Sequence, residues 1–132
     1  MKLPALLDNY FPYYKKGFVF NLASQNKNII KKSLNLAKNG IRLNAKLNCK
    51  FYAFHAGFLF DPNINMLGDK PVPNKIINRR KALASFIKNV KILSKYAYKK
   101  KIKLLIENNV VSKNQYLKYN YKPLMCDVKE SI

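Results

Sequence analysis

Two residues that can bind a metal or move a proton follow short apolar segments of this sequence. Glu107 comes directly after the apolar run 103–106, and His55, the single histidine of the chain, follows the run 51–54. Both runs are typical of buried strands. An amphipathic segment lies between the two runs, and this order is that of a βαβ unit. The parallel strands of such a unit end at the same edge of the sheet. We therefore predict that His55 and Glu107 lie close together at one end of a parallel sheet.

An imidazole and a carboxylate at such a place suit two kinds of chemistry. Either side chain can bind a divalent cation, and a carboxylate suits Mg²⁺ and Mn²⁺ in particular. Glu107 is also a candidate base beside a sugar carbonyl, where isomerisation moves a proton between adjacent carbons and a metal stabilises the oxyanion. The alternatives are a surface glutamate paired with lysine and a partly buried histidine at a strand end.

Two asparagines follow expected strands and are candidate substrate-binding residues. Asn21 comes after the run 18–20, and Asn109 lies two residues beyond Glu107. Their amides can form hydrogen bonds with sugar hydroxyls. The alternative, which we favour, is that each side chain caps the turn after its strand.

The elements that must position these residues are three strands and two helices. We expect strands at 18–20, 51–54 and 103–106, and helices near 28–46 and 78–100, because apolar residues recur in the two long segments at spacings of three and four. In the first helix these residues are Ile30, Leu34, Ala37, Ile41 and Ala45.

Local signals refine this outline. Ser24 is the expected N-cap of the first helix, and Gly40 marks a position where that helix is expected to bend or end. Loops are expected at 59–77 and 108–122. Asp127 and Glu130 have the spacing of a capping pair at the start of a further helix.

Composition places the chain among globular proteins. It has 132 residues, of which 48% are apolar, enough for one domain with a core. Because no run of 18 apolar residues occurs, no membrane span is expected. The apolar stretch 3–7 is too short for a signal peptide. Cys49 and Cys126 form no zinc pattern and suit a reducing compartment, so we expect a cytoplasmic protein.

The net charge of +20 raises the question of nucleic acid. Most of the 26 basic residues are lysines, and they are spread along the whole chain. Arginine, which suits phosphate and base contacts best, is scarce. We therefore favour the interpretation that the positive charge reflects drift in amino-acid composition, with lysines on solvated helix faces, over selection for nucleic-acid binding.

Five segments, taken in order, resemble the xylose-isomerase-like TIM-barrel superfamily of sugar phosphate isomerases, epimerases and AP endonucleases. They are residues 18–24, 51–58, 80–90, 104–110 and 123–126. The resemblance implies an α/β fold, a partial (β/α)8 TIM barrel with about three parallel strands and flanking helices. The match covers barrel strands two to four, so residues 1–132 are expected to form one partial domain, truncated at both ends.

The resemblance also implies a site. The family holds a divalent metal at the mouth of the barrel, and its ligands include a glutamate ending strand four and, in the endonuclease-like branch, a histidine ending strand three. These positions match Glu107 and His55, which implies bound Mn²⁺, Mg²⁺ or Zn²⁺ and a sugar or sugar phosphate as substrate. The isolated chain is expected to lack the remaining ligands.

Two other functions stay open. The charge supports an AP-endonuclease-like DNA repair protein, although the chain offers Lys15 and aromatic residues where that branch has another histidine. A non-catalytic remnant of the fold is the third hypothesis.

Overall fold

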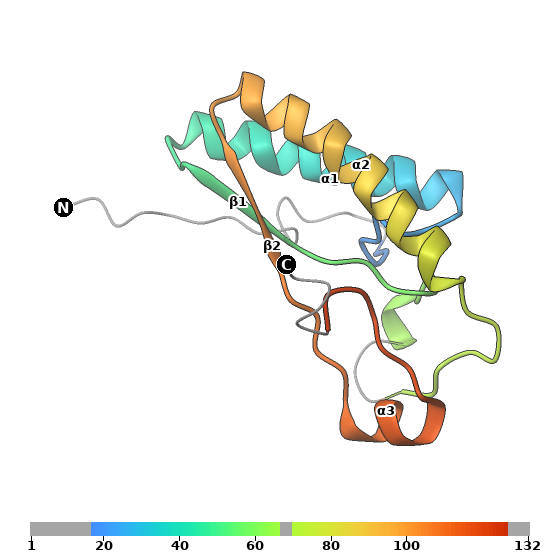
Figure 1. The fold of residues 1–132 in the computed structure, drawn as a ribbon. Coiled ribbons are helices and arrows are strands. Elements are labelled where there is room, and N and C mark those ends of the chain that lie inside the picture. Colours follow the sequence, from blue (N-terminus) through green and yellow to red (C-terminus); the bar gives the residue numbers. More distant parts are fainter. Residues whose placement is uncertain (1–16, 67–69, 127–132) are drawn as a thin grey trace.

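Helices α1 (Lys27–Lys46) and α2 (Arg79–Lys99) lie side by side over one face of a parallel sheet of two strands, β1 (Phe51–His55) and β2 (Lys103–Glu107) (Figure 1). The computed structural model describes residues 17–66 and 70–126. A short 3-10 turn (Ile64–Met66) and helix α3 (Lys113–Tyr119) complete the elements. The leading residues 1–16 and the expected capping pair at 127 and 130 lie outside the described ranges.

Helix α1 confirms the expected helix near 28–46, but its N-cap is Asn26. The Asn26 side chain accepts hydrogen bonds from the backbone N–H groups of Asn28 and Ile29. The expected cap at Ser24 is wrong by two residues, because the Ser24 hydroxyl accepts from Asn26 N and donates to Asp61. The helix also continues through a buried Gly40 to Lys46, so it does not end at that glycine.

Helix α2 confirms the expected helix near 78–100. Its N-cap is Asn78, whose side chain accepts from the N–H groups of Arg80 and Lys81. An N-cap of this kind satisfies two of the donors that every helix leaves unpaired at its start. The face turned to the sheet carries Ala82, Phe86, Asn89, Leu93 and Ala97.

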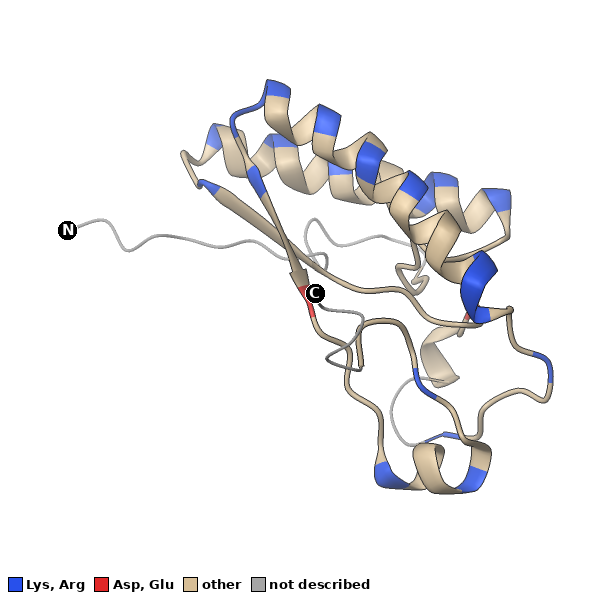
Figure 2. Ribbon diagram, viewed as in Figure 1, with Lys and Arg blue, Asp and Glu red and all other residues tan. Residues whose placement is uncertain are grey.

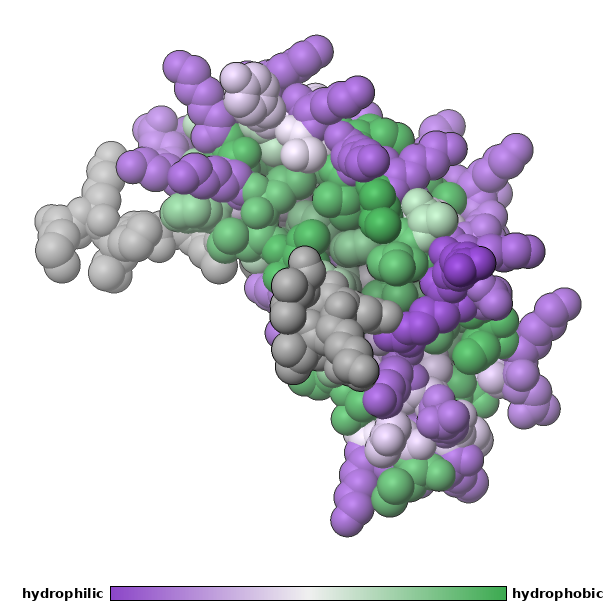
Figure 3. Space-filling model, viewed as in Figure 1, coloured by the Kyte–Doolittle hydropathy of each residue, from purple (hydrophilic) through white to green (hydrophobic). Residues whose placement is uncertain are grey.

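The two strands pair in register from Phe51 with Lys103 to His55 with Glu107. Strand β1 is buried at its three central residues, whereas β2 is more open, with Leu105 and Ile106 about two-fifths exposed (41% and 38%). Figure 3 shows hydrophobic surface in the middle of this face of the molecule and hydrophilic residues along the outer side of the helices. The sheet is therefore best covered beneath the helices and least covered at β2.

The expected strand at 18–20 does not form, and this prediction was wrong. The Phe20 ring does pack on Phe54 of β1, with ring centroids 6.1 Å apart. At Asn21 the chain turns away from β1. The backbone N–H of Asn21 donates to Ser33 Oγ of α1 at 3.0 Å, and a turn follows at residues 22–23. The segment therefore contributes side chains to the core without joining the ladder.

The expected loop at 108–122 contains helix α3, which the sequence analysis missed. Ser112 caps α3 by accepting from Gln115 N, and Asn120 ends it in the left-handed conformation. Gln115 then donates to the carbonyl of Lys70, which ties α3 to the loop after β1. Across the described ranges, no helix combines the length and apolar character needed to cross a membrane.

Candidate functional site

His55 and Glu107 meet at the carboxyl ends of the two strands. They are the last residues of β1 and β2 and face one another in the register. The distance from His55 Nε2 to Glu107 Oε2 is 3.4 Å, and the side chains are 34% and 40% exposed. Strand β2 ends at Glu107, and Figure 2 marks the end of this strand in the colour of acidic residues. The predicted proximity is confirmed, and the pair is open enough for a small molecule to reach it.

The separation of these two atoms is compatible with a shared metal ion. Two ligands bonded at about 2.0–2.2 Å in a tetrahedral site lie about 3.4 Å apart. An imidazole and a carboxylate are a donor set that Zn²⁺ and Mn²⁺ accept. Within residues 17–66 and 70–126, however, no group of three or more His, Cys, Asp or Glu side chains is found. The described part of the chain thus offers two candidate ligands at the strand ends, His55 and Glu107.

Asp61 is the second acid in the described ranges, and its carboxylate has structural partners. Asp61 Oδ1 accepts from Asn21 Nδ2 at 2.9 Å, and Oδ2 accepts from Ser24 Oγ at 2.7 Å. These contacts fix the turn before α1 to the loop after β1. Glu107 is consequently the carboxylate that remains for chemistry at the strand ends.

The geometry of Asn21 fits the turn-capping alternative and not contact with a sugar. Its side chain is fully buried. Asn21 Oδ1 accepts from the N–H groups of Ala23 and Phe58, and Nδ2 donates to the carbonyl of Phe60 at 3.1 Å. Both polar atoms of the Asn21 side chain are therefore engaged with the protein.

Asn109 has a similar role behind the His55–Glu107 pair. Its side chain is buried, and Nδ2 donates to the carbonyls of Ala56, Gly57 and Leu124. It joins the segment after β1 to residues 121–126, and this geometry again fits turn capping. Because both side chains are buried and both amide nitrogens donate to backbone carbonyls, these contacts favour turn capping over sugar binding at the two positions.

Gly57 is a supporting residue that sequence reasoning did not single out. A Cβ atom at this position would lie 2.9 Å from Asn21 Oδ1 and 3.0 Å from the backbone nitrogen of Ala23. The Gly57 carbonyl also accepts from Leu124 N at 3.0 Å. A glycine directly after a buried strand is the available signal for such close approach.

Tyr121 supports the same loop, and burial raises the pKa of its phenol. The Tyr121 hydroxyl accepts from Leu59 N at 3.4 Å, and the ring packs edge-on against Phe60. Because the neutral phenol is favoured in the folded state, its contribution to stability is complete below the unfolded pKa of about 10 and is lost as the pH rises above it.

Tyr121→Phe should therefore flatten the loss of stability above about pH 10. Urea unfolding of the wild-type chain and the variant at a series of pH values measures this difference. The titration of lysines contributes equally to both curves, so it does not affect the comparison. Parallel curves above pH 10 would show that the Tyr121 phenol does not differ between the folded and unfolded states.

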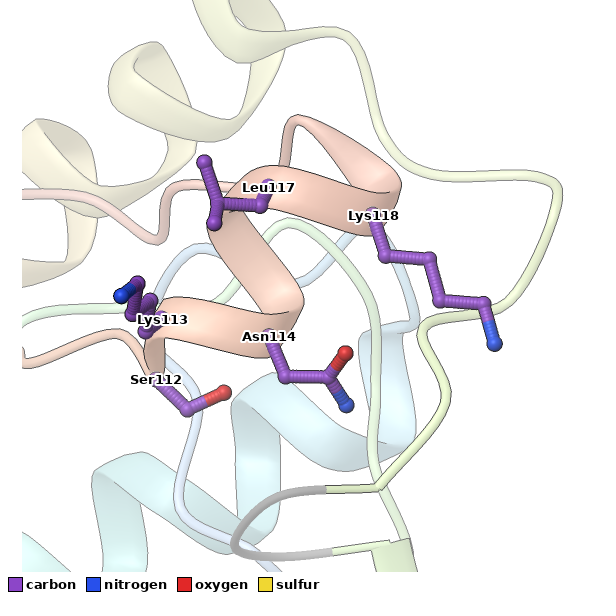
Figure 4. Close-up of a pocket in the computed structure, with 5 residues that line it drawn as sticks. All are labelled: Ser112, Lys113, Asn114, Leu117 and Lys118. Carbon is purple, nitrogen blue, oxygen red and sulfur yellow. The ribbon is translucent and has the colours of Figure 1, made fainter.

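A separate depression of about 550 Å³ lies on α3 and is lined by Ser112, Lys113, Asn114, Leu117 and Lys118. Figure 4 shows that these side chains do not converge on a common point, and that Lys113 and Lys118 extend away from each other. The strand ends, not this depression, therefore form the candidate site.

Comparison with solved structures finds a D-tagatose 3-epimerase-like protein with a TM-score of 0.58 and 16% sequence identity. The match covers 82% of this chain and 34% of the neighbour. The chain has a partial TIM-barrel fold. It spans about a third of the neighbour's length, and its parallel strands with flanking helices are the α/β arrangement expected from the sequence. Comparisons with protein families and with curated proteins find no match.

Proposed function

We propose that His55 and Glu107 form part of a metal-dependent isomerase or epimerase site for a sugar or sugar phosphate. The observation that carries this proposal is the 3.4 Å separation of the two side chains at the carboxyl ends of neighbouring parallel strands. In TIM barrels this face holds the catalytic groups. The epimerase-like character of the structural neighbour supports a sugar as substrate.

Each residue has a role that its chemistry suits. His55 would hold a divalent ion through Nε2, with Glu107 as the second ligand, and the bound ion would supply positive charge for a developing oxyanion. In an isomerisation, the Glu107 carboxylate would take the proton from the carbon beside the carbonyl and return it to the former carbonyl carbon, while the hydroxyl proton moves to the carbonyl oxygen. The partial exposure of both side chains leaves room for a small polar substrate.

The described residues would not complete such a site alone. Catalytic metal sites normally use three or more protein ligands, and the described ranges supply His55 and Glu107. We therefore propose that the site needs ligands from further strands of the barrel, and that the 132-residue chain alone does not turn over sugars.

Binding of Mn²⁺ or Zn²⁺ to the isolated chain should be weak, and Glu107→Gln should weaken it by about tenfold or more, because one of two ligands is lost. Isothermal titration calorimetry measures both affinities. Asp61→Asn is the charge control, since it removes the other described acid, whose partners are Asn21 and Ser24 and not His55. With the fold verified by circular dichroism, it should leave the affinity unchanged.

Two results would contradict this proposal. Tight stoichiometric binding abolished by Glu107→Gln would mean that the chain holds a complete site, and weak binding that Glu107→Gln leaves unaltered would mean that Glu107 is no ligand. Metal-dependent cleavage of an abasic-site duplex, without epimerisation of a ketohexose, would favour the endonuclease alternative instead.

A further inference from the structure

The two long helices carry many cations and no acid. The sequences of α1 and α2 contain neither Asp nor Glu. On α2, five exposed lysines fall on the side opposite the buried face when residues are placed at 100° intervals. They are Lys81, Lys88, Lys91, Lys95 and Lys99, which we name the α2 lysine row. Figure 2 shows the basic residues along the outer side of both helices.

Helix α1 extends this basic surface. Its exposed cations on the outer side are Lys27, Lys31, Arg42 and Lys46. Lys38 is used differently, because its ammonium lies 5.6 Å from the centroid of the Tyr96 ring on α2. The contact joins the two helices, which lie side by side (Figure 1), so that their outer sides are neighbours.

The charges on this surface repel one another. Like charges three or four residues apart destabilise a helix, and Lys91, Lys95 and Lys99 have this spacing. No acid in the described ranges reduces this repulsion. Asp61 contacts Asn21 and Ser24, and Glu107 contacts His55. A bound polyanion would neutralise this repulsion.

Composition alone favoured drift as the origin of the charge, but the alignment of five exposed lysines on one side of α2 is an observation that composition does not contain. We propose that the α2 lysine row, flanked by α1, binds the phosphate backbone of double-stranded nucleic acid without reading its sequence. From Lys81 to Lys99 the row extends about 27 Å at 1.5 Å per residue. That length corresponds to roughly eight base pairs at 3.4 Å each. Lysine suits this role because it contacts phosphate as a point charge and carries no sequence preference.

Nucleic acid fits this surface better than a lipid bilayer does. Helices that bind a bilayer surface bury an apolar face among the lipids. The main apolar faces of α1 and α2 are buried in the protein core, with Ile41, Phe86 and Leu93 among their members. The exposed large apolar residues of α2, which are Ile87, Ile92 and Tyr98, form no continuous apolar face when residues are placed at 100° intervals. The basic surface is also separate from the strand ends, so this proposal does not depend on the His55–Glu107 site.

The test is the salt dependence of binding to a fluorescein-labelled DNA duplex of about 20 base pairs, measured by fluorescence anisotropy. The logarithm of the association constant falls with the logarithm of salt concentration by about 0.9 for each phosphate neutralised. The full chain carrying Lys88→Gln, Lys91→Gln and Lys95→Gln should therefore show a slope reduced by about 2.7.

A second triple variant is the matched control. Lys50→Gln, Lys75→Gln and Lys113→Gln remove the same net charge from exposed positions outside α1 and α2, and should leave the slope close to that of the wild-type chain. The corresponding Lys→Arg variant of the α2 lysine row should also keep the wild-type slope. Far-UV circular dichroism checks that each variant remains helical.

Three outcomes would overturn the proposal. The first is equal loss from both Gln triples, which would mean that binding follows net charge and not the row. The second is absence of duplex binding at low salt. The third is that the Gln triple in the α2 lysine row weakens binding to phosphatidylserine vesicles and leaves duplex binding unchanged. This result would mean that the surface binds lipid.

Discussion

Asn21→Ala should lower the free energy of unfolding by about 3–5 kcal/mol, because it leaves several buried groups without partners. The Asn21 side chain is fully buried and forms hydrogen bonds with Ala23, Phe58, Phe60 and Asp61. Each buried donor or acceptor left unpaired costs about 1–3 kcal/mol. Urea unfolding monitored by circular dichroism measures the change.

The matched control is Asn35→Ala, an exposed asparagine on α1. It should change stability by less than about 0.5 kcal/mol or stabilise slightly, since alanine favours the helix. A cost for Asn21→Ala as small as that of the control would show that the turn before α1 is not held by this side chain.

Phe54→Ala should cost about 3–5 kcal/mol through lost burial and the cavity that remains. Phe54 is fully buried at the centre of β1, and its ring packs against Phe20, Tyr52 and Phe86. Removing the ring would loosen the contact between the sheet, α2 and the segment before α1 at once. Chemical unfolding gives the free energy, and near-UV circular dichroism reports the packing of the remaining aromatic rings.

Leu105→Ala on β2 is the comparison, because it also truncates an apolar residue of the sheet. Leu105 is 41% exposed, so its loss should cost about 1 kcal/mol or less. Equal costs at the two positions would mean that the core is not centred on β1.

The helices and the two paired strands could be predicted because their signals are local. Apolar residues at spacings of three and four predicted α1 and α2, and the runs before His55 and Glu107 predicted β1 and β2. Since parallel strands end at a common edge, the proximity of His55 and Glu107 followed from chain order alone. These predictions needed no knowledge of distant contacts.

The rest depends on tertiary hydrogen bonds that periodicity does not reveal. The run at 18–20 reads as a strand, but Ser33 on α1 takes the backbone N–H of Asn21 and the chain turns. Asn89 on α2 then donates to the Leu22 carbonyl at 2.9 Å, which holds that turn against the second helix. No pattern in the sequence indicated that Ser33 and Asn89, on the buried faces of the helices, would bind the backbone of this turn.

Helix α3 was missed for a different reason. None of its seven residues is buried, so the segment has no apolar face that a sequence pattern could indicate. Its position depends on local caps at Ser112 and Asn120, on a hydrogen bond from Gln115 to Lys70 and on partial packing of Tyr119 against the core. The structure therefore shows this helix clearly, whereas the sequence pattern that would predict it is weak.

The register between β1 and β2 links the length of the second strand to its chemistry. Deleting one residue from 103–106 would shift the pairing by one position, and every later side chain of β2 would turn to the opposite face of the sheet. Glu107 would then leave His55, even though both residues would still be present in the sequence. An insertion or deletion inside β2 would therefore separate Glu107 from His55, whereas a change of length outside the two strands would leave their register unaltered.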